Sequence, residues 1–316
     1  MMKILIPLMD HARLQQLHQS APNVQFLNAG SEREALAVAA ELAATYGYCS
    51  SDLLKAAPRL RWVQVASAGV EGYPLLEMHA RGIIFTNAKG IYGPQLADHT
   101  LALMLAFSRQ LPFLYRAQQK QVWENRQNYP PGELAGQTLL IVGLGGTGLE
   151  TARRAKGFGL RILATRHHVS LTKPDFVDEV HPPDRLHDLL PEADWVAVCV
   201  PLVPATRDLF HDDEFALMKR TAYIVCVTRG KIINADALLR ALEAGEIAGA
   251  GLDVTDPEPL PAGHPLWMKE NVIITPHASG HSPHAGSRMF NLLCENVRRF
   301  ADGRSLLNVV DLELQY

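Results

Sequence analysis

The 316-residue sequence has little that would point to a membrane, a nucleic acid or a disulfide-stabilised fold. No apolar run approaches the roughly 20 residues of a membrane-spanning helix. Residues 1–8 are too few for the apolar core of a signal peptide, so we interpret them as a first strand. A formal net charge of −3 without a long basic run gives no electrostatic reason for a nucleic-acid or membrane partner.

Cysteine is also scarce. The four cysteines, Cys49, Cys199, Cys226 and Cys294, are too scattered for a zinc motif or a disulfide framework. Cys199 and Cys226 lie inside apolar segments, where a buried and reduced thiol is the usual state. We therefore expect a reducing compartment, the cytoplasm.

A metal site is suggested only by three neighbouring histidines, His277, His281 and His284. Gly280 and Pro283 interrupt the helix that would align their side chains on one face. Neither a cysteine nor a carboxylate completes a ligand set at close spacing. We therefore predict that the protein has no metal site.

What the sequence does contain is an alternation of strand-like and helical segments, which is typical of parallel α/β sheets. The length and an apolar content of 47% fit two domains. A helix is expected at 32–45 and a buried one at 95–111, before an irregular, polar arm at 112–133. The expected strands are 3–6, 62–65, 83–86, 138–142, 161–164, 195–200, 223–227, 248–254 and 272–275.

The strand at 138–142 runs directly into Gly143-x-Gly145-x-x-Gly148 and then into a helical pattern. In this context the three glycines form a dinucleotide-binding fingerprint. Gly143 would make the tight turn, Gly145 would let the backbone approach a pyrophosphate, and Gly148 would let the helix pack closely on the sheet. The phosphates would lie at the amino end of that helix.

The acidic residue that commonly follows such a fingerprint by about 20 positions is missing. Its place at the end of the second strand is taken by Thr165 and Arg166. A guanidinium can bind a phosphate dianion through its planar fork, so the sequence favours NADP(H), with NAD(H) still usable. His167 and His168 are equally suited to holding a 2′-phosphate or to being exposed loop residues. Arg166 could also be solvated, or could stack on an adenine.

Three later strands are each followed by a polar group suited to chemistry: Arg229, Glu258 and His277. Open α/β sheets bind their ligands at the carboxyl ends of their strands. A cation, a carboxylate and an imidazole at neighbouring strand ends could bind a 2-oxo acid and exchange a proton with its carbonyl oxygen. Asp256 is the nearest alternative to Glu258, and we interpret His99, in the long helix, as a packed structural residue.

These motifs together resemble the D-isomer-specific 2-hydroxyacid dehydrogenases of the glyoxylate/hydroxypyruvate reductase kind. The resemblance implies a flavodoxin-like substrate domain, residues 1–93 plus 284–316, with a Rossmann-type dinucleotide-binding domain, 94–283, inserted into it. It also implies a homodimer, an active site in the interdomain cleft, and reversible reduction of a small 2-oxo acid to the D-2-hydroxy acid. The matching segments are 65–70, 97–99, 134–145, 200–206, 227–233, 251–259 and 275–277.

The same resemblance implies roles for individual residues. Arg229 would bind and polarise the substrate, His277 would be the acid/base, and Glu258 would hydrogen-bond His277, where its charge favours the protonated ring. Asp253 would hold the nicotinamide carboxamide. The backbone of Ser67, Ala68, Gly69 and Val70 would receive the substrate carboxylate. The cofactor contacts would also include Gly146, Thr147, Pro201 and Thr206.

Three positions depart from the family pattern: Asp98, Cys226 and Asn234, where Glu, Asn and Asp are common. Two other functions therefore remain open. One is a nucleotide-sensing protein of the same fold that binds a partner without turnover. The other is an NAD-dependent relative with another substrate, such as formate or phosphite, although formate enzymes of this fold have an amide where Glu258 stands.

Overall fold

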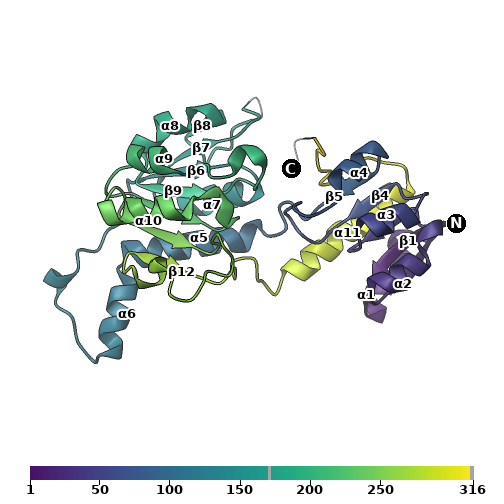
Figure 1. Ribbon diagram of the computed structural model, residues 1–316, viewed down its shortest axis with the longest axis horizontal. Coiled ribbons are helices and arrows are strands. Elements are labelled where there is room, and N and C mark those ends of the chain that lie inside the picture. The colour runs from purple at the N-terminus through teal and green to yellow at the C-terminus, as the bar shows by residue number, and fades with distance from the viewer. Residues whose placement is uncertain (170–171, 314–316) are drawn as a thin grey trace. The chain divides into compact units, whose positions relative to one another are not determined.

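The computed structural model describes residues 1–169 and 172–313, and the chain divides into two compact units (Figure 1). Unit 1 comprises Met1–Ile91 and Ser282–Tyr316, and unit 2 comprises Tyr92–His281. The boundaries fall at 91 and 282, where the sequence suggested 93 and 284. Each unit has its own parallel sheet, which confirms the predicted α/β class.

In the described part of unit 1, a five-stranded parallel sheet has the order β2-β1-β3-β4-β5. Its strands bury apolar residues on both faces, as parallel strands covered by helices do. Leu5, Val63 and Phe85 belong to one cluster, and Ile4 and Trp62 to the other. The strands are β1 (Met2–Pro7), β2 (Val24–Ala29), β3 (Ala44–Tyr46), β4 (Trp62–Gln64) and β5 (Ile84–Thr86). The helices are α1 (His11–Ser20), α2 (Glu32–Ala37), α3 (Ser51–Ala56), α4 (Leu75–Ala80) and α11 (Ala285–Ala301).

In the described part of unit 2, a seven-stranded parallel sheet has the order β12-β11-β10-β9-β6-β7-β8. The order reverses at β6, so the first two connections run to β7 and β8 on one side and the third leads back to β9 on the other side. The strands are β6 (Thr138–Val142), β7 (Arg161–Thr165), β8 (Glu179–His181), β9 (Trp195–Val198), β10 (Tyr223–Cys226), β11 (Gly249–Leu252) and β12 (Val272–Ile274). The helices are α5 (Gly93–Ser108), α6 (Leu111–Gln119), α7 (Gly146–Lys156), α8 (Leu186–Leu189), α9 (Asp212–Leu217) and α10 (Ala235–Ala244).

Helix α5 is buried on several sides, as its apolar pattern predicts. Its amino end is so close to α7 that a Cβ on Gly93 would lie 2.9 Å from the Gly146 carbonyl oxygen. Near its carboxyl end, Phe107 stacks on Tyr223, with ring centroids 4.9 Å apart. The helix therefore belongs to the core of unit 2 and gives a rigid support to the strand ends beside it.

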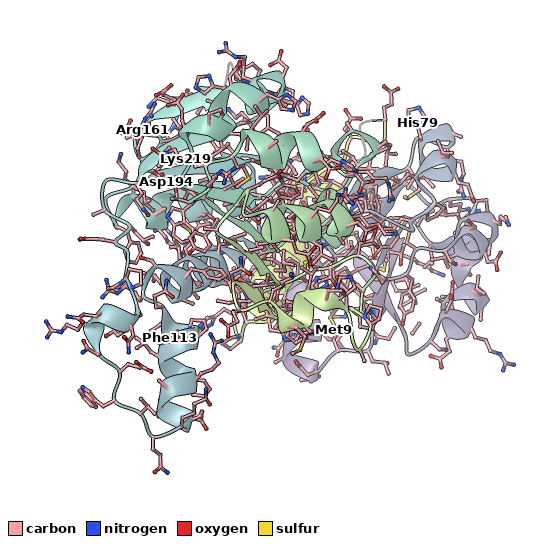
Figure 2. The ribbon with its side chains drawn as sticks, turned by 60° about the vertical axis from the view of Figure 1, so that its left-hand side comes forward. Met9, His79, Phe113, Arg161, Asp194 and Lys219 are labelled. Atoms are coloured by element: carbon pink, nitrogen blue, oxygen red, sulfur yellow. The ribbon has the colours of Figure 1, made fainter. Side chains whose placement is uncertain are left out.

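Two sequence predictions about elements are wrong. The helix expected at 32–45 ends at Ala37, and Ala44–Tyr46 forms β3, because Ala44 and Thr45 pair with Ile4 and Leu5 in the sheet. The arm expected to be irregular at 112–133 begins with helix α6, which projects from the body of unit 2 in both views (Figures 1 and 2). Among the helices of the described residues, none has the length and apolar character to cross a membrane.

Candidate functional site

The fingerprint turn lies at the carboxyl end of β6, a strand whose five residues are all buried. The strand is anchored at its other end by Asp194, which accepts the Thr138 N–H (2.8 Å) and pairs with Lys219 (2.7 Å), beside it in Figure 2. Gly143 has φ +100°, and a Cβ there would lie 2.7 Å from Val200 Cγ1. The turn therefore needs glycine at 143 for its backbone conformation and for space.

Gly145 and Gly148 have opposite surroundings. A Cβ on Gly148 would lie 2.2 Å from the Gly143 carbonyl oxygen, so this glycine allows α7 to pack against the turn. A Cβ on Gly145 would meet nothing within 4 Å, so the backbone there faces open space. The first helical hydrogen bond of α7 is that of Leu149 to Gly145, and the preceding N–H groups of Gly146 and Thr147 lie at its amino end. The cradle thus has the shape and polarity that a pyrophosphate needs.

The two residues predicted to select the cofactor have different surroundings. Thr165 is buried, and its hydroxyl accepts the Gly143 N–H at 3.3 Å, so it supports the fingerprint turn. Its contact with a cofactor stays a prediction. Arg166 is only partly buried, and its guanidinium donates to the Thr172 carbonyl (3.4 Å). The phosphate contact predicted for Arg166 likewise stays a prediction.

Thr206 stabilises the loop after β9 through hydrogen bonds of its hydroxyl. Its hydroxyl donates to the Pro201 carbonyl (2.6 Å) and accepts the Val203 N–H (2.9 Å). Thr206 therefore shapes this loop, next to the fingerprint turn that Val200 contacts. Whether Pro201 and Thr206 also touch a cofactor stays a prediction.

Arg229 follows β10, the middle one of three neighbouring strands. Its turn is pressed against the segment after β11, because a Cβ on Gly230 would lie 1.9 Å from the Thr255 carbonyl oxygen. The Arg229 guanidinium is partly buried and donates to the Thr228 carbonyl (2.8 Å). The close backbone approach at Gly230 fixes the position from which Arg229 extends.

Glu258 and His277 come together, as the sequence suggested. The distance from His277 Nδ1 to Glu258 Oε1 is 2.5 Å, and both side chains keep about two fifths of their surface exposed, 44% and 41%. Since Nδ1 faces the carboxylate, Nε2 is the ring nitrogen available to a ligand. Asp256, the alternative to Glu258, has no contact with His277 among the recorded hydrogen bonds and ion pairs of the described residues.

Asp253 organises the segment that carries His277. Its side chain has no exposed surface, and its carboxylate accepts the Thr275 hydroxyl (2.6 Å) and the N–H groups of Ala278 and Ser279 (2.9 Å each). Burial works to raise the pKa of Asp253, but the hydrogen bonds from Ser279, Thr275 and Ala278 outweigh it and hold that pKa below its usual range. A contact to a nicotinamide carboxamide stays a prediction, and it requires this buried carboxylate to become accessible.

His99 and Gln95 were not expected to belong to the site. His99 Nε2 lies 2.9 Å from Thr275 Oγ1, and the Gln95 amide donates to the Gly280 carbonyl at 3.0 Å. The sequence interpretation of His99 as a packed structural residue therefore did not include its contact with Thr275, two residues before His277. The sequence signal for the pair is the four-residue spacing of Gln95 and His99, because residues four apart share one face of a helix.

The segment after β4 in unit 1 is the predicted receptor for the substrate carboxylate. The Ser67 hydroxyl donates to the Gly69 carbonyl (2.9 Å) and the Ala68 carbonyl accepts the Asn87 amide (2.7 Å). Val70 is buried in the core of unit 1. These contacts give the loop a defined shape at the carboxyl edge of its sheet.

The positions that depart from the family pattern have ordinary structural contacts. Asp98 accepts from Arg154 (2.6 Å), and Asn234 caps α10 by accepting the Ala237 N–H (3.0 Å). Cys226 is buried, and its thiol lies 3.6 Å from the Arg229 carbonyl oxygen. Burial also raises the pKa of Cys199 to about 12, which makes it an unreactive thiol.

Among the residues that the structure describes, no three His, Cys, Asp or Glu side chains are arranged as a metal-ligand set. The polar groups at the strand ends of unit 2 include an acid/base pair, His277 and Glu258, and a cation, Arg229. That chemistry suits a dinucleotide and a small acid.

Comparison with known proteins agrees with this geometry. Residues 101–279 match the model of the D-isomer specific 2-hydroxyacid dehydrogenase, NAD binding domain. A glyoxylate reductase from Korarchaeum cryptofilum is 37% identical over 84% of this chain and 80% of the relative. A D-3-phosphoglycerate dehydrogenase from Methanocaldococcus jannaschii is 32% identical over 83% of this chain and 49% of the relative. A crystal structure of a D-isomer specific 2-hydroxyacid dehydrogenase from Xanthobacter autotrophicus Py2 with NADPH and MES has a TM-score of 0.83, 25% identity and 99% coverage of both chains.

Proposed function

The chain belongs to the D-isomer specific 2-hydroxyacid dehydrogenase family, and we propose that it reduces a small 2-oxo acid, of the glyoxylate or hydroxypyruvate kind, to the D-2-hydroxy acid. The observation that carries this proposal is the pairing of His277 with Glu258 at 2.5 Å, at strand ends next to that of Arg229. It is an NAD(P)-dependent oxidoreductase, and its relatives support reduction of a 2-oxo acid as the reaction class.

The cradle at Gly145 and the amino end of α7 fit the pyrophosphate of a nicotinamide dinucleotide, because a backbone without a Cβ faces open space there. When bound, this cofactor supplies the hydride. Asp253, buried beneath the His277 segment, keeps that segment in place. Substrate binding and proton transfer are carried out by the side chains at the strand ends.

His277 transfers the proton in this proposal. With Nδ1 directed at Glu258, the protonated ring presents Nε2–H to the carbonyl oxygen of the acid and donates it as the alkoxide develops. In oxidation the neutral ring accepts the proton back. Glu258 stabilises the charged ring and fixes its orientation, which is the role that a carboxylate has beside a catalytic imidazole.

Arg229 binds the substrate and polarises it. Its guanidinium has five N–H donors in a planar fork, and one nitrogen is held by the Thr228 carbonyl. The fork matches two oxygens of a 2-oxo acid. The backbone of residues 67–70 completes the binding of the substrate carboxylate in this proposal.

NADP(H) is the preferred cofactor in this proposal, on account of Arg166 at the end of β7. Replacing Arg166 by Asp removes the cation and places a negative charge beside the 2′-phosphate. The ratio of kcat/KM for NADPH to that for NADH should then fall below one. A native protein that uses NADH as well as NADPH would contradict this preference.

We further propose a homodimer in a reducing compartment, the cytoplasm. The part of the arm at 110–129 presents large apolar side chains to solvent in the single chain, Trp123 at 100% and Tyr115 at 61% exposure. A second copy of this chain is the occupant we propose for these exposed side chains. The four cysteines are free thiols, three of them buried.

The reaction is tested by steady-state rates with glyoxylate, hydroxypyruvate, pyruvate and bulkier 2-oxo acids, each with NADPH and with NADH. We expect the small acids to give the highest kcat/KM, and His277→Ala to lose activity in both directions. Phosphohydroxypyruvate belongs in the panel, because one relative is a phosphoglycerate dehydrogenase. Tight NADPH binding without turnover of any acid would instead support the nucleotide-sensing function.

A further inference from the structure

Helix α5 contacts the His277 segment on both of its flanks. Gln95 and His99 are four residues apart and therefore lie on one face of the helix. His99 meets Thr275, two residues before His277, and Gln95 meets Gly280, three residues after it. The segment is thus held at both ends by a helix in the core of unit 2 and at its centre by Asp253.

The direction of the hydrogen bonds follows from the donors available. The pKa of Asp253 is held low, so its carboxylate accepts, and the single proton of the Thr275 hydroxyl goes to it at 2.6 Å. Thr275 Oγ1 must then accept from His99, so His99 carries its proton on Nε2. The result is a chain of hydrogen bonds from α5 through Thr275 to the carboxylate beneath His277.

His277 needs this support because its backbone is in the left-handed region, at φ +51°. For a residue other than glycine this conformation is unfavourable, and it persists only where the surroundings hold it. The His277 N–H donates to the Asp253 carbonyl (2.8 Å), which fixes the centre of the segment. The two contacts from α5 prevent the flanks from relaxing away.

We propose that Gln95 and His99 are positioning residues, which keep His277 aimed at the substrate without touching it. This inference rests on the proposed role of His277 as the acid/base. The two residues act on the placement of the imidazole, and hence on the proton-transfer step.

The test compares His99→Leu, which loses the donor, with His99→Gln, whose amide can reach the same hydroxyl. A misplacement of about 1 Å can cost a factor of about 100, so we expect His99→Leu to lower kcat about 10- to 100-fold. His99→Gln should recover most of that loss. The dissociation constant of NADPH should stay within about twofold. Gln95→Leu should have the same effect through the other flank, and it tests the proposal if His99→Leu fails to fold.

A second measurement separates positioning from a general structural effect. In a His277→Ala background, His99→Leu should cause no further loss, because residues that act through one group are not additive. Asp98→Asn, one residue away on α5 and hydrogen-bonded to Arg154, is the matched control, with unchanged kcat. Additive losses, or no rescue by His99→Gln, would overturn the proposal. Full activity of His277→Ala would instead overturn the proposed function.

Discussion

Glu258 is the residue whose charge can be removed with the least change of shape. Glu258→Gln keeps an oxygen facing His277 Nδ1 and removes the negative charge that favours the protonated ring. Reduction needs the protonated ring, so the reductive kcat/KM should fall. Because both side chains are about two fifths exposed, solvent screens the lost charge, and the loss should be smaller than that of His277→Ala.

Asp256→Asn provides the control for this prediction, because it removes a neighbouring carboxylate that has no recorded contact with His277 in the described part of the chain. It should leave the reductive kcat/KM unchanged. Equal reductive kcat/KM values for Glu258→Gln and the native protein would show that another group holds the imidazole.

Asp253 gives a prediction about stability against acid. Its pKa in the folded protein lies below the usual value, so the carboxylate stabilises the fold above the unfolded-state pKa of about 3.9, and this contribution is lost as pH falls through the folded pKa. Asp253→Asn sets an amide N–H against the donors of Ala278 or Ser279. It should cost about 1–3 kcal/mol at neutral pH.

Denaturant unfolding at several pH values checks this. The difference in free energy of unfolding between the native protein and Asp253→Asn should be largest near neutrality and should shrink below about pH 4. A difference that stays constant down to pH 2 would mean that the cost is one of packing and that the charge contributes nothing.

At the scale of elements, two glycines of the β6–α7 junction have different roles, Gly145 in cofactor binding and Gly148 in folding. Gly145→Ala adds a Cβ that meets nothing in the protein, whereas Gly148→Ala places one 2.2 Å from the Gly143 carbonyl oxygen. We expect Gly145→Ala to keep its melting temperature and to bind NADPH at least about tenfold more weakly. Gly148→Ala should lower the melting temperature, because α7 must move away from the turn.

The comparison needs thermal unfolding without cofactor and a binding titration for each variant. Gly286→Ala, in α11 and also without neighbours for a new Cβ, is the control for an added Cβ; it should leave NADPH binding unchanged and should not lower the melting temperature. Unweakened NADPH binding by Gly145→Ala would place the pyrophosphate elsewhere.

The elements that could be predicted from sequence are those with strong local signals. The strand before Gly143 is buried throughout. Arg229, Glu258 and His277 follow successive strands in the sequence, and these strands, β10, β11 and β12, are neighbours in the sheet. Strand β3 could not be predicted, because three residues carry no periodicity and its partner is β1, forty residues earlier. The side chain of Thr165 is equally ambiguous, since nothing in the sequence says which way a hydroxyl at a strand end will turn.

The support of His277 was missed for a related reason. A left-handed histidine has no sequence signature, and Gln95 and His99 precede it by more than 170 residues. Only the packing of α5 against β10 and β11 shows that a buried helix can be part of a site.

At the scale of the whole molecule, the exposed side chains of the arm predict self-association. The native protein should sediment at about twice the mass of the 34.8 kDa chain. Replacing both Tyr115 and Trp123 by Glu should shift the mass toward that of one chain, because burying two carboxylates in an interface is unfavourable. Trp267→Ala, at another exposed tryptophan of unit 2, should leave the mass unchanged. A native protein that stays monomeric at high concentration would contradict the homodimer.

The Ala278 and Ser279 amides follow the exposed residues Pro276 and His277, and both donate to a carboxylate without exposed surface. Amides next to exposed residues usually exchange their hydrogen with solvent quickly, whereas these two can exchange only when the whole His277 segment opens. Their exchange rates therefore report how often the His277 segment opens and the acid/base leaves its position. This quantity can be followed in the resting protein, with neither cofactor nor substrate present.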